Sequence, residues 1–147
     1  MITVKNLLEY KGYSFWNISP EATVYEALQL MAVKDIGAVL VMQDEKLFGI
    51  FTERDYARKL VLKNHFSKES LIKDFMSTKV FHVNPESGIL ECMKLMTEKH
   101  IRHLPVIENE KVIGIVTIGD LVNEIITRQK TTIIDLENYI CGNYGIK

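Results

Sequence analysis

Two copies of one short pattern hold the residues best suited to bind a ligand. Thr52 is followed three positions later by Asp55, and Thr117 is followed at the same spacing by Asp120. The simplest interpretation is a helix N-cap, in which the Thr and Asp side chains bond each other's backbone amides. The alternative is a sugar site, because an Asp there repels phosphate but accepts hydrogen bonds from neutral donors such as the hydroxyls of a ribose. Because the pattern occurs twice, it indicates two related sites.

Basic side chains near these pairs would suit the phosphate of a nucleotide. Arg54 lies inside the first pattern. Arg102 and His103 precede a predicted buried strand in the second copy, where the first copy has Gly37 and Ala38. An arginine can hold phosphate through two parallel hydrogen bonds. The alternative for Arg102 and His103 is a solvated entrance to the strand. In either case the two predicted sites are inequivalent.

The paired motifs belong to a longer internal repeat. Residues 20–56 recur at 85–121, shifted by 65 positions without a gap, with 14 identities in 37 positions. A repeat of this length indicates one supersecondary unit used twice.

Each copy reads as β-α-β-β-α. In the first copy we expect a strand at 13–18, a helix beginning after Thr23, a buried strand at 37–42, a strand at 47–51 and a helix after Thr52. The last of these helices should bury Tyr56, Leu60 and Val61. In the second copy we expect strands at 79–83, 104–107 and 112–116, a helix with its apolar face at 89–96, and a helix after Thr117. Two such units packed together predict one α/β (α+β) body with pseudo-twofold symmetry.

The flanking segments complete the predicted organisation. Residues 3–11 have helical spacing and end at Gly12. The polar linker is compatible with a short helix at 67–75, and an amphipathic tail at 131–141 ends at Gly142. We therefore divide the chain into a first repeat with the N-terminal helix (1–62), a linker (63–76), a second repeat (77–130) and a C-terminal helix and tail (131–147).

Composition narrows the class of protein. The chain has 147 residues and a net charge of −1, so no overall basic charge would hold it on nucleic acid or an anionic membrane. Its longest apolar run, at 37–42, is too short to span a bilayer, and its N-terminus lacks the features of a signal peptide. Cys92 and Cys141 cannot form a disulfide framework, so we expect a cytoplasmic protein. We see no P-loop, no catalytic Ser-His-Asp or Cys-His set and no metal-ligand spacing, and expect neither an enzyme nor a metal site.

The duplicated motif resembles that of a tandem pair of cystathionine-β-synthase (CBS) domains, a Bateman module. The resemblance covers about residues 12–126 and is carried by Gly49 to Asp55, Gly114 to Asp120 and the segment Ile101-Arg-His-Leu-Pro-Val106. Residues 51–58 and 135–139 are similar, more narrowly, to small stand-alone bacterial proteins of this kind.

The resemblance implies a regulatory sensor that binds adenosine nucleotides in two clefts between the repeats. AMP or NAD is the expected ligand, with ADP, ATP and S-adenosylmethionine as further members of the class, and each Asp would hold the ribose. The first cleft would use Thr52, Arg54, Asp55, Ser77, Thr78, Val80, Ile101, Arg102 and His103. The second cleft would use Thr117, Asp120, Tyr13, Ser14, Phe15, Ile36, Gly37 and Ala38.

This chain departs from the family pattern in three places, one of which is the lack of a basic pair at Gly37 and Ala38. Leu40 stands where a proline is usual, and Gly119 stands where the first copy has Arg54. We therefore expect one cleft to bind more tightly, and the sequence does not indicate which. The resemblance also implies a homodimer formed through the CBS helices and an unidentified regulated protein. The rival hypothesis is a ligand-free dimeric scaffold with its clefts filled by side chains such as Tyr13 and Phe15.

Overall fold

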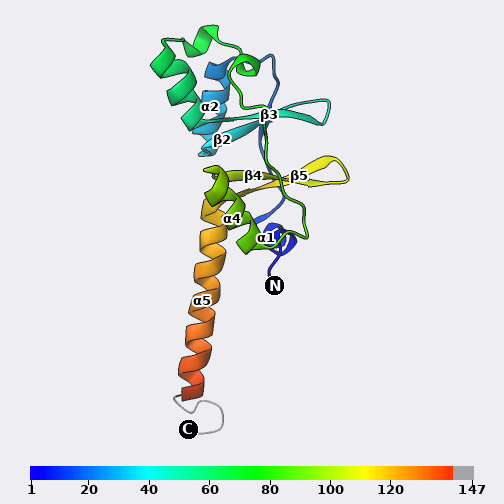
Figure 1. Cartoon of the computed structure of the whole chain (residues 1–147), viewed down its shortest axis with the longest axis vertical. Helices are drawn as coiled ribbons and strands as arrows, with labels where there is room; N and C mark the ends of the chain where they lie inside the picture. Colours follow the sequence, from blue (N-terminus) through cyan, green and yellow to red (C-terminus); the bar gives the residue numbers. More distant parts are fainter. Residues whose placement is uncertain (141–147) are drawn as a thin grey trace.

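Two similar α/β halves lie one above the other, and a long helix projects from the lower half (Figure 1). The computed structural model describes residues 1–140. In the first half, β1 (Asn17–Ile18), α2 (Val24–Lys34), β2 (Ala38–Gln43) and β3 (Lys46–Thr52) lead to the short helix α3 (Glu53–Asp55). The chain then continues through a π-helical turn, η1 (Tyr56–Leu60), and a 3-10 turn, η2 (Val61–Lys63). The second half contains α4 (Ile89–Lys99), β4 (His103–Glu108), β5 (Lys111–Thr117) and α5 (Ile118–Ile140). The predicted pair of repeats is confirmed.

The two hairpins are copies of each other in register. Ala38 pairs with Thr52 in β2–β3, and His103 pairs with Thr117 in β4–β5, 65 positions later in each case. Both turns use two non-glycine residues with positive φ, Asp44 and Glu45 in the first hairpin and Asn109 and Glu110 in the second. This backbone matches the right-handed twist of paired strands. The matched register places each Thr at the same end of its hairpin, where the next helix begins.

The predicted helix after Thr23 is present, and its start is capped as expected. The Thr23 side chain accepts a hydrogen bond from the amide of Glu26 at 3.1 Å. Met31 and Val24 are buried on one face of this helix, α2. The equivalent helix α4 buries Ile89, Cys92 and Met96. The apolar spacing therefore identified the inner faces of both helices.

The two repeats have separate hydrophobic cores, and each is completed by a segment from outside its own repeat. The N-terminal helix α1 (Val4–Lys11) buries Val4, Leu7 and Leu8 in the core of the second repeat. The linker forms two 3-10 turns, η3 (Ser67–Glu69) and η4 (Ile72–Asp74), and Ile72 is buried in the core of the first repeat. The helix predicted at 67–75 is therefore only these two turns. The division at residues 62, 76 and 130 stays a prediction, but α1 packs on the second repeat.

Two predicted strands are shorter than expected. The strand predicted at 13–18 is reduced to β1, which pairs in parallel with β2. The strand predicted at 79–83 was wrong: the segment makes one isolated bridge, Val83 to Val106. Both segments pass from one half of the molecule to the other, and they lack a second strand alongside over most of their length. Residue types that favour strands do not indicate whether a partner strand is in reach.

Two expectations about the last helices were also wrong. The tail predicted to begin at residue 131 is continuous with the helix after Thr117, so α5 runs without a break from Ile118 to Ile140. Val61 was expected to face inward, but it is 52% exposed, whereas Leu60 is fully buried. The π-helical turn before Val61 shifts the helical phase, which the 3.6-residue period does not anticipate.

Over residues 1–140, none of the helices combines the length and the apolar character needed to cross a membrane. Gly142, the predicted end of the tail, lies outside the described residues.

Candidate functional site

Asp55 closes a capping box at the first predicted site. The amide of Thr52 donates to Asp55 Oδ2 at 3.0 Å, and the amide of Asp55 donates to the Thr52 hydroxyl at 3.1 Å. The Thr and Asp of the motif therefore form the helix N-cap that the simplest interpretation predicted. The same cap holds the carboxylate in place, with the side chain nearly buried at 8% residue exposure.

The other oxygen of Asp55 faces two donors from elsewhere. The Ser77 hydroxyl donates to Oδ1 at 3.1 Å, and Lys59 Nζ lies 3.2 Å from the same oxygen. Together with the amide and hydroxyl of Thr52, four donors surround this carboxylate. A carboxylate has about four acceptor positions. A ribose hydroxyl would therefore have to replace one of these donors.

A cleft of about 520 Å³ opens beside Asp55, between the two repeats. Its volume lies within the range of about 300–1,000 Å³ that is typical of small-molecule sites. Seven of the nine residues predicted for the first site line it: Thr52, Arg54, Asp55, Ser77, Ile101, Arg102 and His103. Thr78 and Val80 are not among its lining residues. The cleft is also lined by Gly37, which was predicted for the second site, and by Ile50, Glu53 and Arg58, which were not among the predicted site residues.

Three arginines and two acids line this cleft. Arg54, Arg58 and Arg102 outnumber Glu53 and Asp55, so the lining carries a net formal charge of +1. Arg54 is held in place, because its guanidinium donates to the carbonyl oxygen of His100 at 2.6 Å. That carbonyl is at the C-terminal end of α4, where the helix dipole favours a cation. The cleft thus offers a carboxylate and guanidinium groups, as a sugar phosphate requires.

Asp120 is capped like Asp55, but its second partner differs. The amide of Thr117 donates to Asp120 Oδ2 at 2.9 Å, and the amide of Asp120 donates to the Thr117 hydroxyl at 3.1 Å. The ammonium of Lys11, at the end of α1, lies 2.5 Å from the same carboxylate oxygen. It also donates to the carbonyl oxygen of Ile115 at 2.7 Å. Nothing in the sequence near Asp120 could have indicated Lys11, which is 109 residues away.

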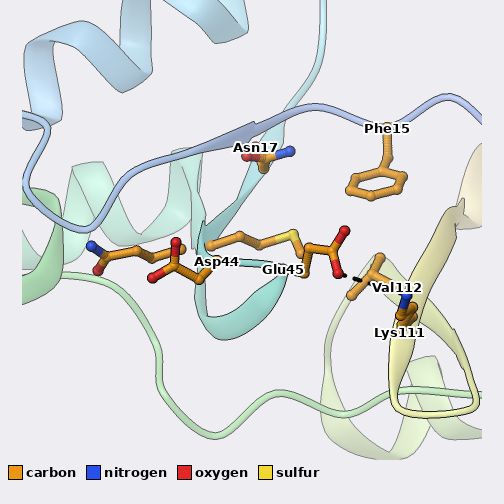
Figure 2. Close-up of a pocket in the computed structure, with 8 residues that line it drawn as sticks. Phe15, Asn17, Asp44, Glu45, Lys111 and Val112 are labelled. Carbon is orange, nitrogen blue, oxygen red and sulfur yellow. Dashed lines mark ion pairs between the residues drawn. The ribbon is translucent and has the colours of Figure 1, made fainter.

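The residues predicted for the second site are spread over several places. Gly37 lines the first cleft, where a Cβ would be 3.2 Å from the carboxylate of Glu53. Phe15 lines a different hollow of about 310 Å³ between the tips of the two hairpins. Figure 2 shows Phe15 there with the tip residues Glu45 and Lys111, whose side chains form an ion pair at 3.7 Å. Tyr13 is 46% exposed and Ala38 is buried. Ser14 and Ile36 are exposed and half-buried, respectively.

His103 lies between the two predicted sites. It lines the cleft beside Asp55, and its electrostatic neighbours include Lys11 and Asp120 of the other site. Burial lowers the pKa of His103 below its ordinary value, and the positive charge of Lys11 lowers it further. Asp120 acts in the opposite direction. The imidazole is therefore held in its neutral form at neutral pH.

A sequence model of the CBS domain matches residues 15–62 and again residues 72–127. The chain belongs to the CBS-domain family. It is 36% identical over 152 aligned residues to the mitochondrial CBS domain-containing protein CBSX3 of Arabidopsis thaliana, with 97% of this chain and 73% of that protein covered. The predicted family and fold are thereby confirmed.

Solved CBS-domain structures share this architecture. A protein of Burkholderia ambifaria, provisionally described as a signal-transduction protein with CBS domains, is 44% identical and superimposes with a TM-score of 0.84. The match covers 87% of this chain and 96% of that one. The CBS domain protein NE2398 is 46% identical, with a TM-score of 0.82 over 85% of this chain and 98% of its own. CBS-pair proteins are generally regulatory, and this chain falls in that class.

Proposed function

We propose that this CBS pair is a non-enzymatic sensor that binds an adenosine nucleotide, AMP or NAD before ADP, ATP or S-adenosylmethionine, in the cleft beside Asp55. The observation that supports the proposal is the cleft itself, which is lined by residues from both repeats. The Asp55 carboxylate would accept hydrogen bonds from the ribose hydroxyls, and the Thr52 hydroxyl would donate a hydrogen bond to one of them. Arg102 and Arg58 would hold the phosphate, since guanidinium groups match its geometry.

Binding in this cleft would couple the two repeats. Thr52 and Asp55 come from the first repeat, whereas Ile101 and Arg102 come from the second. A nucleotide that contacts both sides has its highest affinity for one arrangement of the repeats. Differential affinity of this kind is what allows a ligand to shift a conformational equilibrium. A regulated partner protein would respond to that shift.

The ribose would compete with Lys59 for Asp55. The Lys59 side chain is 40% exposed, so its ion pair with Asp55 is partly solvated and contributes little to stability. Ser77 can rotate its hydroxyl toward another acceptor. We therefore expect the ribose to displace Lys59 and to leave the Thr52 cap intact.

Thermal unfolding with added nucleotide tests the proposal. At 100 times its dissociation constant, a ligand specific for the folded state stabilises the protein by about 2.7 kcal/mol. We expect Asp55→Asn and Arg102→Ala to remove most of this stabilisation by AMP and NAD. Arg128→Ala is the matched control, because Arg128 pairs with Glu124 on α5 and does not line the cleft. Stabilisation that persists unchanged in both cleft variants would contradict the assignment.

Exposed apolar residues support a homodimer through the CBS helices. Val61 and Ile126 occupy equivalent positions in the two repeats and are 52% and 43% exposed. Farther along α5, Ile133, Leu136 and Ile140 remain exposed in the described structure. With Ile126 they follow the heptad spacing of a coiled coil. A second copy of the same chain would cover this uncharged stripe. A lipid surface fits less well, because residues 135 and 137 next to the stripe are acidic.

The dimer also supports a second candidate function, a scaffold that binds no nucleotide. The four donors around Asp55 favour this alternative, because they satisfy the carboxylate without a ligand. A scaffold would show no stabilisation by any adenosine nucleotide while remaining dimeric. A cytoplasmic location stays a prediction from the sequence for either function.

A further inference from the structure

The C-terminal part of α5 extends beyond both repeats. Among the described residues of α5, Ile125 is the last that packs against the core of the second repeat. Residues 126–140 continue the helix for about 22 Å, and Figure 1 shows them projecting away from both halves. All of them are exposed except Asn138, which is half-buried. This projecting segment therefore gains little stability from packing on the rest of the described chain.

The amino acids of the projecting segment are poor helix formers. Seven of its 15 residues are isoleucine or threonine, whose branched side chains lose rotamer freedom in a helix. The Thr131 hydroxyl donates to the carbonyl oxygen of Thr127 in the preceding turn, a contact that slightly weakens a helix. An isolated helix of this length is marginal in water even when its sequence is favourable. The segment therefore needs a partner to remain helical.

One face of the projecting segment carries the pattern of a coiled coil. Isoleucine recurs at every seventh residue, and a second row of residues follows three positions after the first two isoleucines. These seam residues are Ile126, Ile133 and Ile140 in the first row and Gln129 and Leu136 in the second, and all of them are exposed. In heptad terms the rows are positions a and d. Isoleucine at a with leucine at d favours two parallel strands. The pattern therefore indicates the same segment of a second copy as the partner.

Gln129 distinguishes the two possible directions of the pair. In a parallel pair in register, the two copies of Gln129 meet and can hydrogen-bond each other, because an amide both donates and accepts. In an antiparallel pair with Ile133 against Leu136, Gln129 would face Ile140 and lose its partner. A polar residue inside an apolar seam lowers stability but specifies the register. Gln129 therefore favours the parallel direction.

The position of Ile126 also favours the parallel direction. The antiparallel pair would bring Lys130 opposite Glu137, but exposed ion pairs contribute little. It would also hold the two copies of Ile126 about 25 Å apart along the helices and leave them uncovered. A parallel pair brings the two copies of Ile126 together, so the seam continues directly from the proposed dimer contact of the CBS helices.

We propose that residues 126–140 pair with the same residues of a second copy as a parallel, two-stranded coiled coil, and that this pairing keeps the segment helical. The inference rests on the homodimer of the proposed function, and adds the direction of the pair and its coupling to helix formation. It does not depend on nucleotide binding. In such a dimer both CBS modules lie at the same end of the coiled coil.

Cross-linking of single cysteines tests the direction. The background is Cys141→Ser, in which the remaining natural thiol, Cys92, is buried. We expect a short bis-maleimide to link Ile140→Cys into covalent dimers, because parallel helices bring residue 140 of both copies together. Thr131→Cys is the matched control, since residue 131 lies on the face opposite the seam, and it should stay monomeric on a denaturing gel. Gln129→Cys and Ile140→Cys refolded together should give no mixed dimer.

Each other outcome overturns the inference, and the oligomeric state separates it from the proposed homodimer. Mixed dimers between residues 129 and 140, without dimers between two copies of residue 140, would show an antiparallel pair. Equal linking of Ile140→Cys and Thr131→Cys would show random collisions. No linking in a protein that sediments as a dimer would place the dimer contact away from the seam. A monomer by sedimentation velocity would overturn both this inference and the proposed homodimer.

Circular dichroism tests the coupling between pairing and helix formation. Ile133→Glu places a charge in the seam, and Thr131→Glu places the same charge on the outer face. Glutamate forms helices better than isoleucine or threonine, and each new acid has another acid four residues later, Glu137 or Asp135. We expect only Ile133→Glu to lose about a quarter of the helical signal, the segment's share of the described α-helical residues. Equal helical signals in the two variants would overturn the coupling.

Discussion

The backbone at Gly49 lies against the carbonyl oxygen of Ser77, so that a Cβ at residue 49 would be 2.7 Å from that oxygen. Strand β3 and the first residue after the linker exchange two hydrogen bonds here, from Ile50 to Ser77 and from Ser77 to Ile50. Gly49 thus permits the linker to close over β3 and to bring Ser77 to Asp55. The glycine of the motif is explained by this close approach rather than by an unusual φ angle.

Gly49→Ala should destabilise the protein by about 3 kcal/mol, the upper part of the range for overpacking, because the added methyl group meets backbone that cannot rotate away. Gly114→Ala is the matched comparison in the second repeat. There a Cβ would meet the ends of the Leu8 side chain at 3.1 and 3.2 Å, and a side chain can adjust. We expect a cost of about 1 kcal/mol for this change. Urea unfolding of both variants measures the difference, and equal costs would contradict the explanation.

Val61→Glu and Ile126→Glu should each convert a dimer to monomers, because each buries a charge in the proposed interface. Val33→Glu is the control, since Val33 is 76% exposed on α2 and is not among the residues named for the proposed interface. Sedimentation velocity measures the oligomeric state. If neither change alters the sedimentation coefficient, Val61 and Ile126 do not lie in a dimer interface.

The protein should lose stability in mild acid in part through His103. Burial, followed by the charge of Lys11, lowers the pKa of His103 in the folded state, so the unfolded chain binds a proton first as the pH falls. Stability therefore rises with pH through the window just below the ordinary histidine pKa of about 6.5. In His103→Gln, denaturant unfolding at pH 7.5 and pH 5 should show a smaller loss on acidification. An unchanged loss would show that His103 does not contribute.

Lys11→Met should raise the pKa of His103 in the folded protein. The variant removes a nearby positive charge that lowers this pKa and leaves Asp120, whose charge raises it, without its lysine. An NMR titration of the imidazole follows the change directly. Lys5→Met is the control, because Lys5 is an exposed lysine on the same helix, and it should leave the pKa of His103 unchanged. A downward shift in Lys11→Met would contradict the geometry described for Lys11.

Cys92 should resist thiol reagents in the folded protein. Burial raises the pKa of its thiol to about 11, with the charge of Glu91 adding to the effect. At pH 8 only on the order of one thiol in a thousand would then be the reactive thiolate. In a Cys141→Ser background, labelling of Cys92 should be slow and should accelerate with denaturant. Rapid labelling under native conditions would show that the site opens to solvent.

Sequence reasoning located the motifs because their signals are local. Thr52 and Asp55 bond each other across three residues, and the apolar face of α4 follows a fixed helical period. The internal repeat then related one site to the other. What the sequence could not provide was the contact made by Lys11, since a lysine at the end of a surface helix has no local feature that indicates its partner.

The one strand that was wrong also depended on distant context. The segment at 79–83 has the valine and phenylalanine residues typical of a strand but has a single bridge to its neighbour, at Val83. Phe15 was assigned to the second cleft, which stays a prediction, and it lines the hollow at the hairpin tips. Gly37 was assigned to the second cleft, which stays a prediction, and it lines the cleft beside Asp55.

The packing of α1 in the core of the second repeat has a consequence for folding during synthesis on the ribosome. The helix α1 is synthesised before both repeats, but the core that receives Leu8 includes Val116 and Leu121, which belong to the second repeat. While the first repeat and the linker are synthesised, the apolar face of α1 therefore has no core to pack against. Docking of α1 must follow synthesis of the second repeat, so a chain that stopped before Val116 would leave α1 without the surface that buries Leu8.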